Sequence, residues 1–384
     1  MSRAAILLFL FAIAAPLAAQ GPPKGTWLTK DKKQFVAELI AADGWRATFQ
    51  PADKPKFVLA YTELDPEDAD SIRSWRATYF RTPLVDPTLL SKWPNQAAAE
   101  KFDVRASGEE GGIFSYESPT FHFMSDLRLP LSAVRDIATV LEATRAVLIA
   151  IPLGLHAGGE QAKYSVLMYG TPEAYAAAGG PTGSGGYYDG RGRRMLVLLP
   201  NFGIEQKGGV VRLNYSSNYF VLKHEVTHQL LARWHGQLPM WLSEGIAEFI
   251  ASIPYSAGRY NLQKPGAGLH DYILKWRKSP DNRVVTVVPT KDLMALEERG
   301  WRKAVAQGAA YDLYNSAALL TWYFIQEDGG TRFAAYLDAL RRGDDKAESL
   351  LLKGRKTEVV DEDLAAMAKK MGLIEKKDPN AKKR

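Results

Sequence analysis

The chain begins with an apolar stretch that differs in pattern from everything after it. Residues 4–15 are almost entirely apolar, follow Arg3, and lead into small residues that end at Ala19. A positive start followed by a short apolar run is typical of a secretory signal peptide, and the run is short for a membrane-spanning helix. We therefore expect residues 1–19 to be a signal peptide and the mature protein to be exported, periplasmic or extracellular, with no stable membrane insertion.

Residues 26–76 contain short runs of alternating apolar and polar positions, separated by turn signals such as Asp43-Gly44. Alternation with a period of two predicts β-strands, and their short, regular spacing predicts a small all-β barrel. From Leu64 to Trp75 the pattern changes to that of a short helix. The segment resembles the SH3-like barrel modules attached to exported proteins. The resemblance implies an accessory role, with a component of the cell envelope as the expected partner.

The rest of the chain is expected to hold one larger domain. Prolines early and glycines late in residues 77–111 predict a linker with a short helix. Residues 112–373 mix strand and helix patterns, which predicts an α+β fold, and beyond about residue 253 we expect the chain to be mostly helical as far as about residue 373. The elements expected before residue 219 are strands at 114–124 and 164–169, a helix at 131–149, and a hairpin joining 187–188 to 195–199.

Composition narrows the classes of function. The chain has 384 residues and no cysteine, which excludes disulfides, a cysteine nucleophile and cysteine-ligated metal. The net charge is +6, but the tail holds +4 of it between Lys376 and Arg384 and Arg3 holds another +1. The folded part is thus nearly neutral, and we expect residues 374–384 to be a basic, solvated tail. Nothing in the sequence indicates a nucleic-acid partner.

The most informative motif is His-Glu-Val-Thr-His at residues 224–228. Histidines four apart share one face of a helix, so His224 and His228 can bind a single Zn²⁺ ion. Glu225 lies beside the first ligand, where a carboxylate can act as general base towards water held at the metal. The alternative is a surface helix that carries these residues by chance. The apolar flanks argue against it, because they predict a packed helix whose polar groups need partners.

A second motif, Trp-Leu-Ser-Glu-Gly-Ile-Ala-Glu-Phe, occupies residues 241–249. Pro239 and Pro254 delimit a helix that presents Glu244 and Glu248 on one face, at positions i and i+4. Glu244 can supply the third metal ligand and leave the fourth position open. Glu248 can accept a hydrogen bond from a ligating imidazole, or it can be a solvated charge. Gly245, beside the ligand, is expected to permit a close approach of the two metal-binding helices.

Together, the two motifs resemble those of the gluzincin metallopeptidases, specifically the bacterial peptidase MA-like families. The likeness extends upstream to residues 118–126 and downstream to 314–324, so it covers about residues 112–350. It implies a gluzincin-type catalytic domain with a mixed sheet whose edge strand, beside the metal helix, pairs with extended substrate. It also implies that Tyr314, or less favourably Tyr311, donates a hydrogen bond to the oxyanion.

One departure from the family concerns substrate. The aminopeptidase branch carries a Gly-x-Met-Glu-Asn segment that grips a free amino terminus, and this chain has no such segment. The hypothesis is therefore a zinc-dependent endopeptidase acting on peptides or proteins. The alternatives are an aminopeptidase of the same superfamily, or a non-hydrolytic zinc-containing binding or scaffold protein of the envelope.

Overall fold

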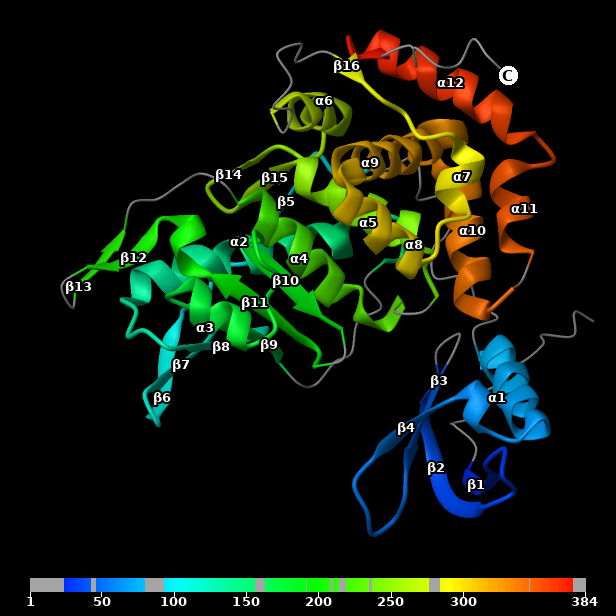
Figure 1. The fold of residues 1–384 in the computed structure, drawn as a ribbon, viewed down its shortest axis with the longest axis horizontal. Coiled ribbons are helices and arrows are strands. Elements are labelled where there is room, and N and C mark those ends of the chain that lie inside the picture. The colour runs from blue at the N-terminus through cyan, green and yellow to red at the C-terminus, as the bar shows by residue number, and fades with distance from the viewer. Residues whose placement is uncertain are drawn as a thin grey trace, which may run out of the picture. The chain divides into compact units, whose positions relative to one another are not determined.

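The computed structural model describes residues 24–42, 46–79, 93–155, 163–190, 192–207, 210–213, 219–234, 237–275, 284–344 and 346–375. The expected signal peptide at 1–19 and residues 376–384 of the expected basic tail lie outside the described residues. The tail was expected to start at residue 374, which is wrong, because Ile374–Glu375 forms the short strand β17 and pairs with β16 (Val284–Val285). The chain divides into two compact units, residues 1–82 and 83–384, and each is described by itself (Figure 1). Among the described residues, no helix combines the length and the apolar character needed to cross a bilayer.

The smaller unit is an antiparallel sheet packed against one helix. The strands are β1 (Lys24–Leu28), β2 (Gln34–Ala42), β3 (Arg46–Gln50) and β4 (Phe57–Ala60), and the helix is α1 (Pro66–Tyr79). Alternate side chains of the strands meet α1 in a core that includes Trp27, Leu39, Phe49 and Ile72. The strand order is β1-β2-β3-β4, and an antiparallel bridge between Thr29 and Leu64 joins the segment after β1 to the segment after β4. The expected short strands and the helix that follows them are thus present.

The larger unit is built on a mixed six-stranded sheet in the order β10-β11-β9-β8-β7-β6, in which β8, β9 and β11 are parallel neighbours. The strands and the helices on it are β6 (Arg105–Glu110), β7 (Ile113–Glu117), β8 (Phe121–Ser125), α2 (Leu131–Ala150), β9 (Tyr164–Tyr169), α3 (Pro172–Ala177), β10 (Gly186–Asp189) and β11 (Arg194–Leu198). The expected α+β class and mixed sheet are confirmed.

Strand β11 is apolar throughout most of its length because both faces of the sheet are covered at this strand. Side chains alternate between the faces of a strand. Met195 and Val197 belong to the main core together with side chains of α2 and α4. Leu196 and Leu198 instead pack against Tyr175 of α3 on the opposite face. A strand buried on both sides carries a continuous apolar sequence, as this one does.

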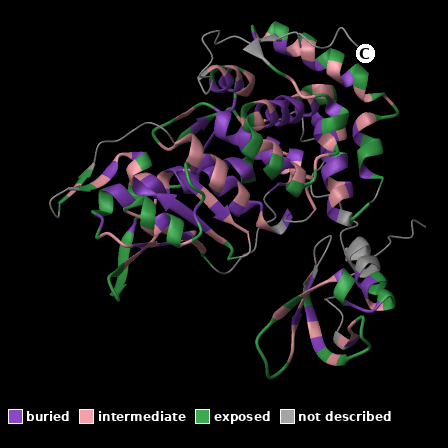
Figure 2. Cartoon of the chain, viewed as in Figure 1, coloured by how far each residue is buried: buried purple, intermediate pink, exposed green. Residues whose placement is uncertain are grey.

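Two expectations about the chain before α2 are wrong. Within 77–111, expected to be an irregular linker, Arg105–Glu110 forms β6 of the main sheet, and β5 (Gln96–Ala98) pairs with β15 (Arg259–Asn261). The larger unit thus begins well before residue 112. The single strand expected at 114–124 is two strands, β7 and β8, joined by a turn at Ser118 to Thr120. Figure 2 shows β6 exposed along its length, as is typical of a sheet edge.

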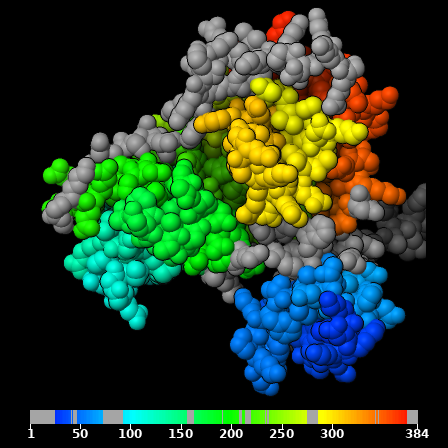
Figure 3. Space-filling model, in the orientation of Figure 1, coloured from blue at the N-terminus to red at the C-terminus, as the bar shows by residue number. Residues whose placement is uncertain are grey.

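The second half of the larger unit is mostly helical, as expected. Its helices are α4 (Phe220–Leu230), α5 (Met240–Ser252), α6 (Pro265–Lys275), α7 (Thr290–Met294), α8 (Glu298–Ala304), α9 (Ala310–Gln326), α10 (Thr331–Arg342), α11 (Ala347–Leu352) and α12 (Thr357–Lys370). The remaining strands are short: β12 (Ile204–Lys207), β13 (Val210–Leu213), β14 (Tyr255–Ser256), β16 (Val284–Val285) and β17 (Ile374–Glu375). In Figure 3, the green segments and the yellow-to-orange segments of this unit form adjoining surfaces on one face.

Candidate metal centre

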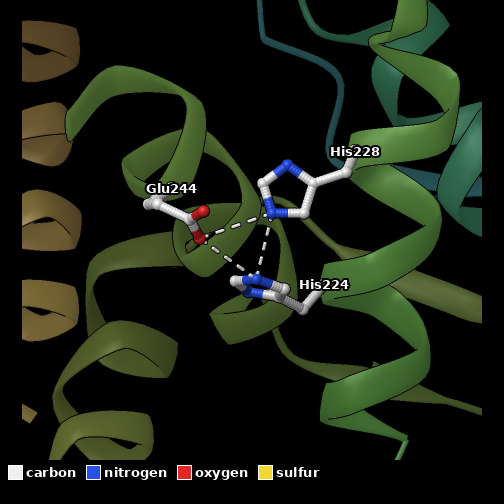
Figure 4. A group of neighbouring side chains, drawn as sticks. All are labelled: His224, His228 and Glu244. Carbon is white, nitrogen blue, oxygen red and sulfur yellow. Dashed lines mark hydrogen bonds and ion pairs between the residues drawn. The ribbon is translucent and has the colours of Figure 1, made fainter. Parts of the chain in front are cut away.

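Helix α4 carries both histidines of the first motif. Its apolar side chains Leu222, Val226 and Leu230 are buried in the main core, which fixes how the helix is rotated about its axis. His224 and His228 therefore project from another face, one turn apart. Figure 4 shows both rings directed towards Glu244 of α5.

Helix α5 brings the third group. It begins directly after Pro239 and ends at Ser252, two residues before Pro254, as the two prolines predict. The Nε2 atoms of His224 and His228 are 3.1 Å apart. Glu244 Oε2 lies 3.3 Å from His224 Nε2 and 3.4 Å from His228 Nε2. The two motifs thus converge on one point.

The spacing of these three atoms fits a metal ion. In a tetrahedral site with bonds of about 2.0–2.1 Å, two ligand atoms are roughly 3.3 Å apart. Glu244 Oε2 is also buried, and apart from the two imidazole nitrogens it has no hydrogen-bond partner among the described residues. A buried carboxylate oxygen without a hydrogen bond is costly unless another group compensates it. His224, His228 and Glu244 therefore form a set that can hold one metal ion.

Glu248 occupies the place expected of an outer partner. Its Oε1 lies 3.2 Å from His224 Nδ1, the ring nitrogen that faces away from the other ligands. Its second oxygen, Oε2, accepts a hydrogen bond from the hydroxyl of Tyr272 on α6. Glu248 is buried, so the alternative of a solvated helix charge does not apply. The sequence gives no signal for Tyr272, because a tyrosine 24 positions away belongs to no motif.

The imidazoles and carboxylates of the site shift each other's pKa values. Burial alone would lower the pKa of His224, but the carboxylates of Glu248 and Glu244 raise it well above its ordinary value. Burial alone would raise the pKa of Glu244, but His228 and His224 hold it well below its usual range. The cluster therefore favours an ionised carboxylate facing a positive charge, which is the electrostatic arrangement that a cation would share.

Glu225 is held by the edge of the sheet. The backbone N–H of Tyr188 on β10 donates a 2.9 Å hydrogen bond to Glu225 Oε2. Strand β10 is the end strand of the sheet, and it packs closely on α4 at Gly186, where an added Cβ would lie 3.2 Å from Glu225 Cγ. The expected hairpin of 187–188 with 195–199 is confirmed as β10 and β11, with β10 outermost. A backbone N–H has no residue-type signature, so the sequence could not reveal this contact.

Tyr314 reaches the site from α9, whereas Tyr311 does not. The ring of Tyr314 lies 6.1 Å from that of His224 and 5.5 Å from that of Trp301. Burial, and secondarily the charge of Glu244, raises the pKa of the Tyr314 hydroxyl well above its ordinary value. The hydroxyl thus stays protonated and can donate a hydrogen bond. Tyr311, one turn earlier, is 46% exposed.

Gly245 permits a close helix approach, but not between the two metal-binding helices. A Cβ at this position would lie 2.1 Å from Thr321 Oγ1 and 2.5 Å from the carbonyl oxygen of Ala317, both on α9. The expectation of a close contact between α4 and α5 at Gly245 is therefore wrong. The glycine allows α5, which carries the candidate ligand Glu244, to lie close to α9, which carries Tyr314.

Comparison with known proteins adds little about function. Residues 219–343 match the model of a protein family described only as a protein of unknown function, DUF1570. The matched region includes α4, α5 and α9, and so contains the three candidate metal ligands and Tyr314. No curated protein and no solved structure matches the chain.

Proposed function

We propose that this chain is an exported zinc-dependent peptidase of the gluzincin type, which hydrolyses internal peptide bonds with Glu225 as general base. The observation that carries the proposal is the convergence of His224 Nε2, His228 Nε2 and Glu244 Oε2 within 3.1–3.4 Å of one another, next to Glu225. Export depends on the expected signal peptide. The smaller unit is proposed to bind or space the enzyme at the cell envelope.

The donor set supports zinc as the metal. Two imidazoles and one carboxylate, with no cysteine in the chain, are the ligands of a catalytic zinc site with one open position. When bound, zinc supplies Lewis acidity, which polarises a carbonyl group and allows water to lose a proton near neutral pH. Glu248 would keep the His224 ring in the tautomer that points Nε2 at the metal position.

Glu225 performs the proton transfer in the proposed reaction. The Tyr188 N–H holds Oε2, so the carboxylate has a fixed orientation while Oε1 accepts the proton of the attacking water. The same carboxylate then delivers the proton to the nitrogen of the departing amine. Stabilisation of the oxyanion is assigned to the protonated hydroxyl of Tyr314 on α9, whose ring lies 6.1 Å from that of His224.

Substrate is proposed to bind as an extended strand beside β10. This strand ends the sheet and adjoins Glu225, so a peptide added there would bring a scissile bond to the metal position. The lack of an amino-terminus grip favours internal cleavage. The two alternatives are an aminopeptidase and a non-hydrolytic zinc protein of the envelope, and the experiment must distinguish both from an endopeptidase.

The test is to incubate the mature protein with a broad peptide library, with and without a chelator, and to map the products by mass spectrometry. We expect internal cuts that the chelator abolishes. Stepwise loss of amino-terminal residues would instead establish an aminopeptidase, and metal binding without any cleavage would establish the non-hydrolytic alternative.

The matched variants are Glu225→Gln and Glu205→Gln, the latter on β12 away from the metal ligands. Because glutamine keeps an oxygen for the Tyr188 N–H but cannot accept the proton, Glu225→Gln should retain one zinc per chain and lose roughly 10²–10⁴-fold in kcat. Glu205→Gln should cleave normally. Full activity of Glu225→Gln would refute the mechanism.

A further inference from the structure

The strongest unassigned feature beside the metal centre is a line of buried polar groups that runs away from it. Tyr272 donates its hydroxyl hydrogen to Glu248 Oε2, and Glu248 Oε1 faces His224 Nδ1 at 3.2 Å. The side chains of Glu248 and His224 are 8% and 15% exposed, so little water competes for these contacts. One carboxylate thus has a separate partner for each of its oxygens.

The packing of α6 fixes the position of Tyr272. At Gly268, one turn before Tyr272, a Cβ would lie 2.4 Å from the carbonyl oxygen of Ser252, so only glycine allows this approach of α6 to the end of α5. The Tyr272 ring also packs edge-on against Phe220, with ring centroids 5.1 Å apart. Phe220 begins α4, one turn before His224. The tyrosine is therefore held by both metal-binding helices.

These contacts allow the Tyr272 hydroxyl to fix the orientation of the Glu248 carboxylate. A carboxylate with one anchored oxygen has lost its rotational freedom, so its other oxygen is aimed at the imidazole without further ordering. The imidazole is then held as the tautomer with hydrogen on Nδ1, and the lone pair of Nε2 faces the other ligands. Burial raises the pKa of Tyr272 well above its ordinary value, which keeps the hydroxyl a donor at all physiological pH values.

We propose that Tyr272 is a positioning residue, which orients Glu248 and through it the His224 imidazole, and so raises the affinity of the site for its metal ion. This inference rests on the metal centre of the proposed function. It does not rest on peptide hydrolysis, and its test needs no substrate.

The experiment compares the zinc dissociation constants of Tyr272→Phe and Tyr260→Phe, measured by competition with a chromophoric chelator at fixed pH. Tyr260 is the matched control, because it is also buried and its hydroxyl makes a 2.6 Å hydrogen bond with Thr144, which is not one of the candidate ligands. Loss of an outer partner costs about 10–100-fold in metal affinity. Tyr272 lies one step further out, so we expect zinc to bind about 5–20-fold more weakly to Tyr272→Phe and unchanged to Tyr260→Phe.

A double-mutant cycle separates positioning from general loosening of the fold. In a Glu248→Ala background, Tyr272→Phe should have no further effect on zinc affinity, because the group through which it acts is gone. Equal losses with and without Glu248 would overturn the proposal, as would unchanged affinity of Tyr272→Phe. The urea midpoint of each metal-free variant checks that all of them are folded.

The outcomes also distinguish this inference from the proposed function. If the wild-type protein binds no zinc, the proposed metal centre fails and this inference fails with it. If the wild-type protein binds one zinc but Tyr272→Phe binds it equally well, only this inference fails. If zinc binds as expected but no peptide is cleaved, the assignment of Tyr272 holds and the peptidase assignment fails.

Discussion

Replacing Gly245 by alanine tests the geometry of the site without any assumption about its chemistry. The new Cβ would lie 2.5 Å from the carbonyl oxygen of Ala317, whereas ordinary contact begins at 3.4 Å, so α9 must retreat by about 0.9 Å. Overpacking of this kind costs about 1–3 kcal/mol, with the upper end expected because backbone must move. Alanine regains about 1 kcal/mol through its helix propensity. The net expectation is a loss of about 2 kcal/mol.

The assay is urea unfolding followed by tryptophan fluorescence. Gly300→Ala in α8 is the control, because a Cβ there meets only the flexible end of Leu296 and should leave stability unchanged or slightly higher. Adding Thr321→Ala to Gly245→Ala removes the nearer obstacle but leaves the Ala317 carbonyl, so it should restore only part of the stability. A Gly245→Ala protein as stable as the wild type would refute the close packing of α5 on α9.

Three further predictions address the base, the fold and pH. Tyr188→Pro removes the N–H that donates to Glu225, whereas Tyr188→Ala keeps it. In a peptidase assay, the kcat of the proline variant should therefore be at least about tenfold lower than that of the alanine variant. Equal kcat values would show that this N–H does not orient Glu225. Glu142→Ala removes the buried carboxylate that accepts hydrogen bonds from Ser118 Oγ and from the backbone N–H and hydroxyl of Thr120. We expect the free energy of unfolding, measured in urea, to fall by about 3 kcal/mol. A fall below about 1 kcal/mol would show that these hydrogen bonds do not stabilise the fold. Hydrogen bonds from Lys163 and Arg105 lower the pKa of Glu117 to about 2, so its contribution is present above the ordinary carboxyl pKa and disappears as pH falls towards 2. The difference in melting temperature between the wild type and Glu117→Gln should therefore narrow from pH 7 to pH 3, and a constant difference would show that this carboxylate does not titrate as described.

The convergence of the three candidate metal ligands was predictable because its geometry is local. Histidines four apart on a helix and a glutamate between two prolines define their directions before any tertiary contact is known. The alternation in residues 164–169 and the helical spacing in 131–149 likewise identify β9 and α2 almost to the residue. In β9 and α2, most of the side chains that are buried belong to apolar positions of the sequence pattern.

The parts that escaped prediction lack such a pattern. All six residues of β6 are exposed, so this edge strand shows no alternation of apolar and polar positions. A glycine at position 245 indicates that another segment packs closely there, but the sequence does not show which segment, and the structure identifies it as α9. The hydrogen bonds of Tyr272 and of the Tyr188 N–H form only when distant segments pack together.

The contact between β10 and Glu225 also bears on the order in which the molecule matures. The three candidate metal ligands lie on two consecutive helices, α4 and α5, so they are close together in the sequence. Orientation of Glu225 requires β10, which joins the six-stranded sheet through β11 and lies more than 30 residues before Glu225 in the sequence. Contacts within a short stretch form before those between distant segments. Under the proposed function, the candidate metal ligands would therefore come together before the general base is oriented, so metal binding would precede hydrolytic competence during folding.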